Sequence, residues 1–418
     1  MGEFVDGRRD AQFIPSGLEA DRGQAMSHEL CGRHYVTGDP IELQMERERI
    51  SRVIELTGSR AEAAGTFWLA PALVDLQVNG FAGWDFNVPG VTVEQVEGVT
   101  RALGKAGVAY YCPAVTTGPR ENMTHSLHTI AAACQKDLAT CRAVLGIHLE
   151  GPYISPEDGP RGAHPIWAVR PPVYEEFLDM QEAAGGRIRI VTLAPELPGA
   201  IPFIERLTSD GIVVGLGHLS ADTEQIAAAV AAGARISTHL GNGSHAQLPR
   251  HSNYLWDQLS CDRLWASIIP DGHHLPPAVV KCILRCKGVE RTILVSDAMF
   301  AAGMPPGEYL FMDQRVTLTS EGRVQLAGTP YLAGSSHHLV EGIGNVMAFA
   351  GVTLAEAIRM GGENPRRLLG MATQPDELCA GSPADLLLLR QEGDPSRLSL
   401  VATIVAGQVV YEDEVGQP

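Results

Sequence analysis

The stretch VLGIHLE, residues 144–150, is an apolar run that ends on a potential metal ligand. Two later apolar runs carry such a ligand at the same place, GIVVGLGH at 211–218 and RISTHL at 235–240. If the three runs are parallel neighbours in one sheet, their carboxyl ends meet at one point. The side chains that would meet there are Glu150, His218 and His239.

One carboxylate and two imidazoles suit a divalent ion such as Zn²⁺ or Fe²⁺ and leave coordination positions for water and substrate. An open site of this kind favours hydrolysis over a purely structural role. Each residue alone has a more ordinary interpretation, because a single histidine at a strand end is more often a hydrogen-bonded core residue. The repetition of one context is what indicates a metal centre.

Apolar runs alternate with amphipathic helical patterns along most of the chain, as an α/β fold of the TIM type, a (β/α)8 barrel, requires. One helix is predicted after Thr92, a possible N-cap, and another from a cap at Ser220 or Asp222 to Gly233. A doubly wound sheet is the alternative, but no glycine-rich phosphate loop follows the first strand. The eight predicted strands are 72–78, 108–115, 144–150, 187–194, 211–218, 235–240, 265–272 and 292–298.

The chain has 418 residues, which exceeds one barrel of typical size by about 100 residues, and the excess lies at the two ends. Residues 27–70 and 378–418 contain short strands and turns, and we expect them to pair into one small β-sandwich domain beside a barrel at 71–377. Residues 1–26 show neither periodicity nor an apolar signal segment, which predicts a disordered leader. Met26 would serve as a second start.

The composition excludes several classes of partner. A net charge of −17, from 49 acidic and 32 basic residues, argues against a general nucleic-acid or anionic-membrane surface. No apolar segment is long enough to span a membrane. The eight cysteines are scattered and form no zinc-ribbon pair, which favours free thiols in a reducing cytoplasm.

Several separated motifs, in a fixed order, give the chain a resemblance to a known family. From about residue 67 to residue 412 it resembles the N-acetylglucosamine-6-phosphate deacetylases of the amidohydrolase superfamily. The resemblance implies an amidohydrolase-type barrel that hydrolyses an N-acetyl group. The matching stretches are PALVDLQVNGFAGWDF, GIHLEGPYISPEDGPRGAH, VGLGHLSAD, STHLGN, IPDGHHLP, LVSDAMFAAG and LAGSS.

The same resemblance assigns Glu150, His218 and His239 as the ligands of one divalent metal ion per chain. Many amidohydrolases have His-x-His after the first strand, whereas this chain has Gln77 and Asn79 there, as in family members with a single metal. Amide side chains are weak zinc ligands, which also disfavours a second tightly bound ion. We expect these two amides on the substrate side of the site, with water or backbone as their alternative partners.

Asp297, after the last predicted strand, matches the family's catalytic aspartate. A carboxylate there would take a proton from water and later deliver it to the departing amine, although an aspartate at that place also suits a helix N-cap. His274 matches the histidine that touches the acetyl carbonyl and stabilises the oxyanion, unless its neighbour His273 holds that place. Asp271 would brace their loop, and His164 matches a loop histidine near the substrate sugar.

The expected phosphate site differs from the family pattern. Asn242 and the backbone amide of Gly243 still offer an anion site, and Arg250 keeps its expected offset. Gly241 replaces an aromatic residue and Ser244 replaces a methionine, so the phosphate site departs further from the family pattern than the deacetylation residues do. In the family this arginine reaches the active site of a neighbouring subunit, which implies a homodimer.

The predicted function is metal-dependent hydrolysis of N-acetylglucosamine 6-phosphate, a small-molecule substrate, to glucosamine 6-phosphate and acetate. Two alternatives within enzymes are a deacetylase of another or unphosphorylated N-acetyl amino sugar and an N-acyl-D-amino-acid deacylase. A non-catalytic sugar-binding barrel is the alternative from another class. Retention of both the ligand trio and Asp297 argues against it, because a binding protein needs no proton shuttle.

Overall fold

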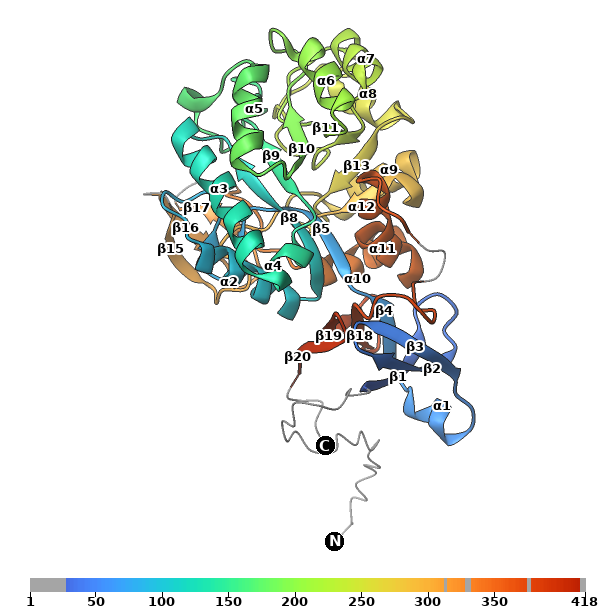
Figure 1. The fold of residues 1–418 in the computed structure, drawn as a ribbon. Coiled ribbons are helices and arrows are strands. Elements are labelled where there is room, and N and C mark those ends of the chain that lie inside the picture. The colour runs from blue at the N-terminus through green and yellow to red at the C-terminus, as the bar shows by residue number, and fades with distance from the viewer. Residues whose placement is uncertain (1–27, 312–313, 328–331, 374–376, 414–418) are drawn as a thin grey trace.

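A computed structural model describes residues 28–311, 314–327, 332–373 and 377–413. The predicted leader, residues 1–26, lies outside the described residues. The described chain has a barrel of alternating strands and helices, with a small sheet below it in Figure 1. Among the described residues, no helix combines the length and the apolar character that a membrane span requires.

The barrel wall is one eight-stranded sheet in the order β14-β13-β12-β11-β10-β9-β8-β5, with parallel pairing between neighbours. A parallel bridge from Val78 to Ala298 joins the first and last segments. Each strand lies within one of the eight predicted runs or differs from it by a residue at one end, so the predicted barrel is confirmed. The strands are β5 (Leu73–Val78), β8 (Val108–Thr116), β9 (Ile147–Glu150), β10 (Ile188–Leu193), β11 (Val213–Leu216), β12 (Ile236–Ser237), β13 (Trp265–Ile268) and β14 (Thr292–Leu294).

The helices lie outside the barrel wall (Figure 1), and their ends follow the expected capping chemistry. Thr92 and Asp222 each form a capping box with a glutamine at the third helical position. Gly233 ends its helix in the left-handed conformation that glycine adopts without strain. The helices are α2 (Val93–Lys105), α3 (Arg120–Lys136), α4 (Leu138–Ala143), α5 (Tyr174–Ala183), α6 (Ala200–Ser209), α7 (Thr223–Ala232), α8 (Tyr254–Ser260), α9 (Pro277–Lys287), α10 (Leu339–Ala350), α11 (Leu354–Gly361) and α12 (Glu363–Leu368), with two 3-10 turns, Ile166–Ala168 and Val289–Arg291.

Both faces of the barrel strands are buried, which explains why the strands read as nearly continuous apolar runs. One face joins the helices in the main hydrophobic core. Alternate residues form a second cluster, which receives one or more side chains from β5, β8 and β10–β14. Among its members are Val74, Cys112, Ile190, Val213, Ile236, Trp265 and Ile293.

The two ends of the chain form one seven-stranded sheet in the order β20-β19-β18-β4-β1-β2-β3, so the predicted small β domain from both termini is confirmed. It closes where β4 pairs antiparallel with β18, which places Leu69 opposite Leu388. Its own core combines residues from both ends, among them Leu43, Ile50 and Ile404. The strands are β1 (His28–His34), β2 (Pro40–Glu46), β3 (Arg49–Glu55), β4 (Phe67–Pro71), β18 (Leu386–Gln391), β19 (Leu398–Val405) and β20 (Gln408–Glu412), with the short helix α1 (Ser59–Ala63) between β3 and β4.

A third element was not predicted. Between β14 and α10 the chain forms a three-stranded antiparallel sheet from β15 (Gly307–Phe311), β16 (Gln314–Leu318) and β17 (Val324–Leu326). A two-stranded hairpin, β6 (Gly80–Phe81) and β7 (Trp84–Asp85), follows β5. Not all of the residues beyond a minimal barrel therefore lie at the two ends. The predicted domain limits at residues 71 and 377 stay a prediction.

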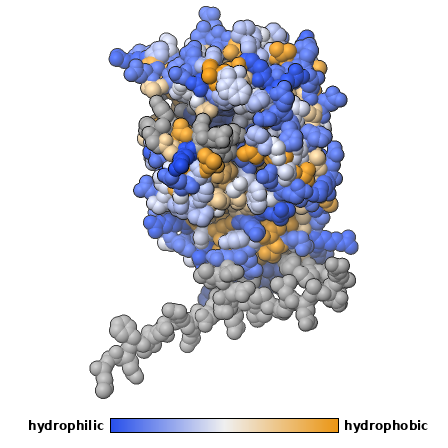
Figure 2. Space-filling view, turned by 90° about the vertical axis from the view of Figure 1, so that its left-hand side faces the viewer, coloured by the Kyte–Doolittle hydropathy of each residue, from blue (hydrophilic) through white to orange (hydrophobic). Residues whose placement is uncertain are grey.

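One face of the molecular surface is mostly hydrophilic. Figure 2 shows a face on which hydrophilic residues dominate and hydrophobic residues form smaller groups between them.

Candidate active site

The three predicted metal ligands converge at the carboxyl ends of neighbouring barrel strands. Glu150 ends β9, and His218 and His239 each follow their strand by two residues. The Oε1 atom of Glu150 lies 2.9 Å from Nε2 of His239 and 3.4 Å from Nε2 of His218. All three side chains are buried. The Glu150 carboxylate thus lies beside both imidazoles, and the binding of one ion by all three residues stays a prediction.

His164 joins this group, although the sequence placed it near the sugar. Single ligand atoms of Glu150, His164 and His218 all lie within 4.8 Å of one another. The His164 ring lies edge-on to the His218 ring, 4.4 Å away, and its Nδ1 contacts Thr117 Oγ1 at 2.9 Å. Burial lowers the pKa of His164 to about 3, so its ring is neutral and keeps a lone pair. The site therefore contains a Glu/His/His cluster able to bind a metal.

The orientation of His218 depends on two backbone contacts. Its Nδ1 lies 2.8 Å from the carbonyl oxygen of Pro160, which fixes the ring and turns Nε2 toward Glu150. Gly243, with φ +55°, packs on the other side, where a Cβ atom would lie 2.6 Å from Nδ1. A side chain at residue 243 would thus displace the imidazole. Gly243 was predicted to bind substrate, and the structure also makes it a support for the ligand.

The backbone is strained at three of the predicted site residues. His218, His239 and Asp297 have φ values of 52°, 31° and 49°, in the left-handed region that residues with a Cβ rarely adopt. Such a conformation costs about 1–3 kcal/mol per residue and persists only where surrounding structure enforces it. These positions lie after β11, β12 and β14. The same deviation at three strand ends is typical of a functional site.

Gln77 and Asn79 contact the two carboxylates of the site. Gln77 Nε2 donates to Glu150 Oε1 at 2.8 Å, and Asn79 Nδ2 donates to Asp297 Oδ1 at 2.7 Å. Their predicted role as substrate contacts stays a prediction. The structure adds that each amide holds one carboxylate in place.

Asp297 directly precedes Ala298, whose bridge to Val78 closes the barrel. Burial raises its pKa to about 6, and the negative charge of Glu150 acts in the same direction. No helix begins at Asp297 in the described segment that leads to β15, so the alternative interpretation as an N-cap is wrong. A buried carboxyl group with a pKa near neutrality is suited to transfer a proton in both directions.

His274 is paired with Asp271. Its Nδ1 lies 2.6 Å from Asp271 Oδ2, and Asp271 Oδ1 accepts the backbone N–H groups of His273 and His274. Burial alone would raise the pKa of Asp271, but these contacts with His274 lower it to about 2. His273 instead contacts the carbonyl oxygen of Glu321 at 2.9 Å. His274 is therefore the histidine of this pair that is oriented by a carboxylate.

The match to protein-family models covers residues 68–410, and the matching model is the Amidohydrolase family. The chain belongs to this family. The site lies at the carboxyl ends of the barrel strands of this amidohydrolase, where such barrels carry their reaction centres.

Relatives of this amidohydrolase include deacetylases of amino-sugar phosphates. The N-acetylgalactosamine-6-phosphate deacetylase of Escherichia coli O157:H7 is 34% identical over 87% of this chain and 95% of its own length. The N-acetylglucosamine-6-phosphate deacetylase of Vibrio furnissii is 32% identical over 88% of this chain and 90% of its own length. An Asp-to-Ala mutant of the Mycobacterium smegmatis N-acetyl-D-glucosamine-6-phosphate deacetylase, solved in complex with N-acetyl-D-glucosamine-6-phosphate, has a TM-score of 0.81 at 28% identity and covers 92% of this chain and 99% of its own. The predicted resemblance is confirmed.

The polar groups of the amidohydrolase site fit a bound cation. Among the described residues, the Asn79 Oδ1 acceptor and the His239 Nδ1 ring nitrogen are buried without a hydrogen-bond partner. The Asn242 Nδ2 group also has no partner, but it is a donor and suits a substrate oxygen, not a cation. The Glu150 carboxylate accepts a hydrogen bond from the Gln77 amide and lies against the imidazoles of His218 and His239. A carboxylate and imidazoles are the donors that Zn²⁺ and Fe²⁺ prefer.

The predicted phosphate residues lie on one loop but not around one point. The backbone N–H of Asn242 donates to the carbonyl oxygen of His239 at 2.9 Å, which keeps Asn242 beside the ligand cluster. Arg250 lies farther along the loop, where it is exposed, and its carbonyl oxygen accepts from Trp256 Nε1 at 3.3 Å. The loop is tied to residues 151–165 because His245 Nε2 lies 3.0 Å from Glu157 Oε2. Within one chain, Arg250 is thus not placed by any described contact at the reaction centre.

The sequence reasoning missed His148, which supports the site from below. It is buried, with Nδ1 3.1 Å from the carbonyl oxygen of Leu76 and Nε2 2.8 Å from Thr192 Oγ1. The available signal was its spacing, because residues two apart on a strand share a face. His148 therefore shares the face of β9 that carries Glu150.

Proposed function

We propose that this amidohydrolase removes the acetyl group from N-acetylglucosamine 6-phosphate and releases glucosamine 6-phosphate and acetate. The observation that carries this proposal is the convergence of a Glu/His/His cluster with a buried Asp297 and an oriented His274 at one end of the barrel. The names of the relatives supply the substrate class.

We place one Zn²⁺ or Fe²⁺ ion per chain on Glu150, His218 and His239, with His164 beside them. When bound, the ion supplies Lewis acidity that acidifies water and polarises the acetyl carbonyl. Gln77 holds the Glu150 carboxylate in orientation through its 2.8 Å hydrogen bond. The Pro160 carbonyl does the same for the His218 ring.

The protein's own groups move the protons. Asp297 accepts a proton from the attacking water and then delivers it to the amine nitrogen as the amide bond breaks. Asn79 keeps Asp297 Oδ1 in place for both transfers. Asp271 accepts the Nδ1–H of His274, and an Nε2–H on the same ring donates to the acetyl oxygen on which negative charge develops.

Acetate release from a panel of N-acetyl sugars tests this function. We expect N-acetylglucosamine 6-phosphate to be turned over with a higher kcat/KM than N-acetylgalactosamine 6-phosphate, plain N-acetylglucosamine or an N-acetyl-D-amino acid. Preference for the galactosamine compound is the strongest alternative, because a relative with that name is 34% identical. Absence of acetate with every compound in the metal-loaded protein would favour a sugar-binding role instead.

The Asp271–His274 pair gives one prediction about this mechanism. Asp271→Asn is expected to lower kcat by about 10- to 100-fold with little change in KM, because the amide no longer fixes the proton on Nδ1. Asp262→Asn, at an exposed position after α8, is the matched control and should leave both constants unchanged. Unchanged kcat in Asp271→Asn, together with an unchanged pH profile, would reduce Asp271 to a loop brace.

We further propose a homodimer in which Arg250 binds the substrate phosphate of the partner subunit. The exposed side chains of Trp256 (55%), Trp167 (70%) and Ile166 (52%) support an interface at this end of the barrel. The two loops that carry them are joined through Glu157 and His245. We also place the enzyme in the cytoplasm, because the spacing of its scattered cysteines is not typical of a disulfide framework.

A prediction about Arg250 follows from this arrangement. Each charge-assisted hydrogen bond to phosphate contributes about 1.5–3 kcal/mol, so Arg250→Ala should raise KM for the 6-phosphate about tenfold or more. The same variant should turn over the unphosphorylated sugar as the wild type does. The Arg263→Ala control should leave KM for the 6-phosphate unchanged. Mixing Arg250→Ala with His218→Ala protein should restore activity through hybrid dimers. Equal kinetics of phosphorylated and plain sugars in the wild type would remove the phosphate site and favour an unphosphorylated substrate.

A further inference from the structure

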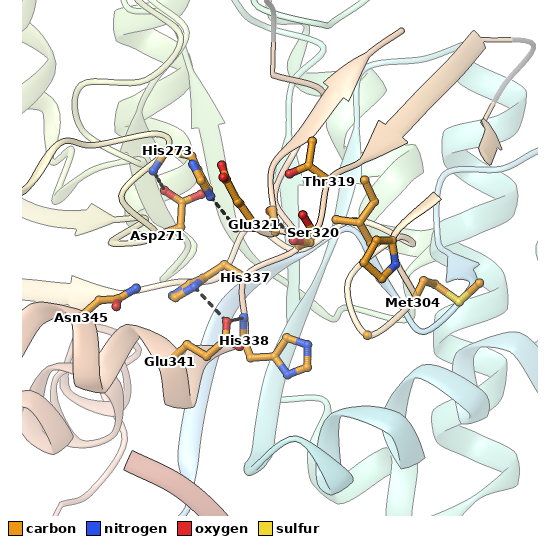
Figure 3. A pocket seen from close by; sticks show the side chains of 15 residues that line it. Asp271, His273, Met304, Thr319, Ser320, Glu321, His337, His338, Glu341 and Asn345 are labelled. Carbon is orange, nitrogen blue, oxygen red and sulfur yellow. Dashed lines mark hydrogen bonds and ion pairs between the residues drawn. The ribbon is translucent and has the colours of Figure 1, made fainter. Parts of the chain in front are cut away.

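A separate cavity lies on the other side of the loop that holds His274. Its volume is about 640 Å³, within the range of small-molecule sites. Figure 3 shows side chains from several segments around it: the loop with Asp271 and His273, the segment with Met304, the turn at 319–322, and the start of α10. The unpredicted sheet β15–β17 thus supplies one wall, and none of the ligands of the proposed metal site lines the cavity.

The charges of the lining select among ligand classes. Among the residues that the structure describes, three carboxylates line this cavity, from Asp271, Glu321 and Glu341, and no lysine or arginine does. Three imidazoles also line it, from His273, His337 and His338, and Nδ1 of His337 lies 3.6 Å from Glu341 Oε2. A phosphate or carboxylate ligand would face these three carboxylates with only imidazoles, and no lysine or arginine, to offset their charge, which is unfavourable. An amine would instead be attracted to the rim, where Glu321 is exposed.

The neutral groups of the lining fit a ligand rich in hydroxyl groups. Thr319, Ser320 and Ser336 contribute hydroxyls, and Asn345 uses its amide nitrogen on the Pro270 carbonyl at 2.9 Å, which leaves its oxygen as an acceptor. Met304 and Leu318 add apolar surface for the C–H face of a sugar ring. A site for an apolar ligand usually has only a few polar groups, so this lining favours a polar ligand.

One residue joins the cavity to the reaction centre. Asp271 lines the cavity and also binds Nδ1 of His274 at 2.6 Å. His273 beside it spans the cavity wall to the Glu321 carbonyl at 2.9 Å. A molecule in the cavity therefore contacts the same short loop that orients His274.

From these observations we propose that the cavity is a second binding site, for an amino sugar that carries no phosphate. The free amine contacts the carboxylates of Glu321 and Glu341, and the ring hydroxyls contact the turn at 319–320 and Asn345. This site is distinct from the proposed deacetylation site and does not depend on it.

Calorimetric titration of glucosamine into the full-length protein tests the proposal. We expect saturable binding that weakens at least tenfold in Ser320→Trp, because an indole at this exposed position fills the mouth of the cavity. Ser209→Trp, an exposed serine at the end of α6, is the matched control and should bind as the wild type does. His218→Ala, which disables the proposed metal site, should also keep the binding.

Three results would overturn the second site. The first is that glucosamine does not bind, and the second is that it binds Ser320→Trp as tightly as it binds the wild type. The third is that His218→Ala loses the binding whereas Ser320→Trp keeps it. Glucosamine 6-phosphate and inorganic phosphate are the charge controls. If either bound as tightly as glucosamine and lost its binding in Ser320→Trp, the assignment of the ligand class would be wrong. Because His218 is a ligand of the proposed metal site and does not line the cavity, failure of the proposed function and failure of this site are distinguishable.

Discussion

Asp297→Asn is expected to lower kcat by a factor on the order of 10² or more while the protein keeps its fold and its metal. The amide has nearly the same shape and still contacts Asn79, but it neither accepts nor delivers a proton. Steady-state kinetics with the 6-phosphate measure kcat, thermal unfolding tests whether the fold is kept, and elemental analysis tests whether the metal is kept. The effect should appear in kcat because the proton transfers follow substrate binding.

Asp85→Asn is a matched control for this variant. Asp85 is also a buried aspartate, and burial raises its pKa to about 7, but it lies in the β6–β7 hairpin and accepts from the backbone N–H of Asn87 at 2.7 Å. An amide oxygen serves that contact equally well, so kcat should not change. Near-normal turnover in Asp297→Asn would assign proton transfer to another group.

The second large effect concerns the metal. His218→Ala and His239→Ala are each expected to lower metal affinity by more than about 10²-fold. Loss of a group that only hydrogen-bonds to a metal ligand lowers affinity by about 10- to 100-fold, and loss of the ligand itself should cost more. Elemental analysis after dialysis should find about one divalent ion per chain in the wild type. It should find almost none in either variant, and activity should fall in proportion.

His128→Ala, at an exposed position on α3, controls for the loss of a histidine elsewhere. Two tightly held ions per wild-type chain would contradict the single-metal site that Gln77 and Asn79 indicate. Full metal content in both variants would show that the ion is held elsewhere, with His164 and Glu150 as the remaining candidates.

The barrel could be predicted from the sequence because its physical signal is local. A parallel strand buried on both faces requires a continuous apolar run, and each of the eight runs is one strand. The three ligands were visible for a related reason, because each follows such a run directly. The cap residues Thr92 and Asp222 act within their own first helical turn, so they too were predictable.

The remaining features depend on contacts that no local pattern encodes. The strands β15–β17 are partly exposed and alternate polar with apolar residues, so they lack the runs that marked the barrel. His164 lies on a long loop, and its contacts with Thr117 and with the His218 ring, on other strand ends, bring it close to Glu150. The role of Gln77 and Asn79 on the carboxylates likewise depends on pairings of residues 73 and 218 positions apart.

The small sheet has a consequence for synthesis of the protein. Leu69 in β4 finds its partner Leu388 in β18 only after the ribosome has added roughly 300 further residues, which takes on the order of 15 to 60 s at typical elongation rates. During that time the edge of β4 carries unpaired backbone groups, and such edges recruit strands from other nascent chains. The first part of the chain to emerge is thus the last to be completed. We therefore expect aggregation during expression to begin at this edge. Lower growth temperatures or added chaperones should increase the yield of native protein without any change in its final stability.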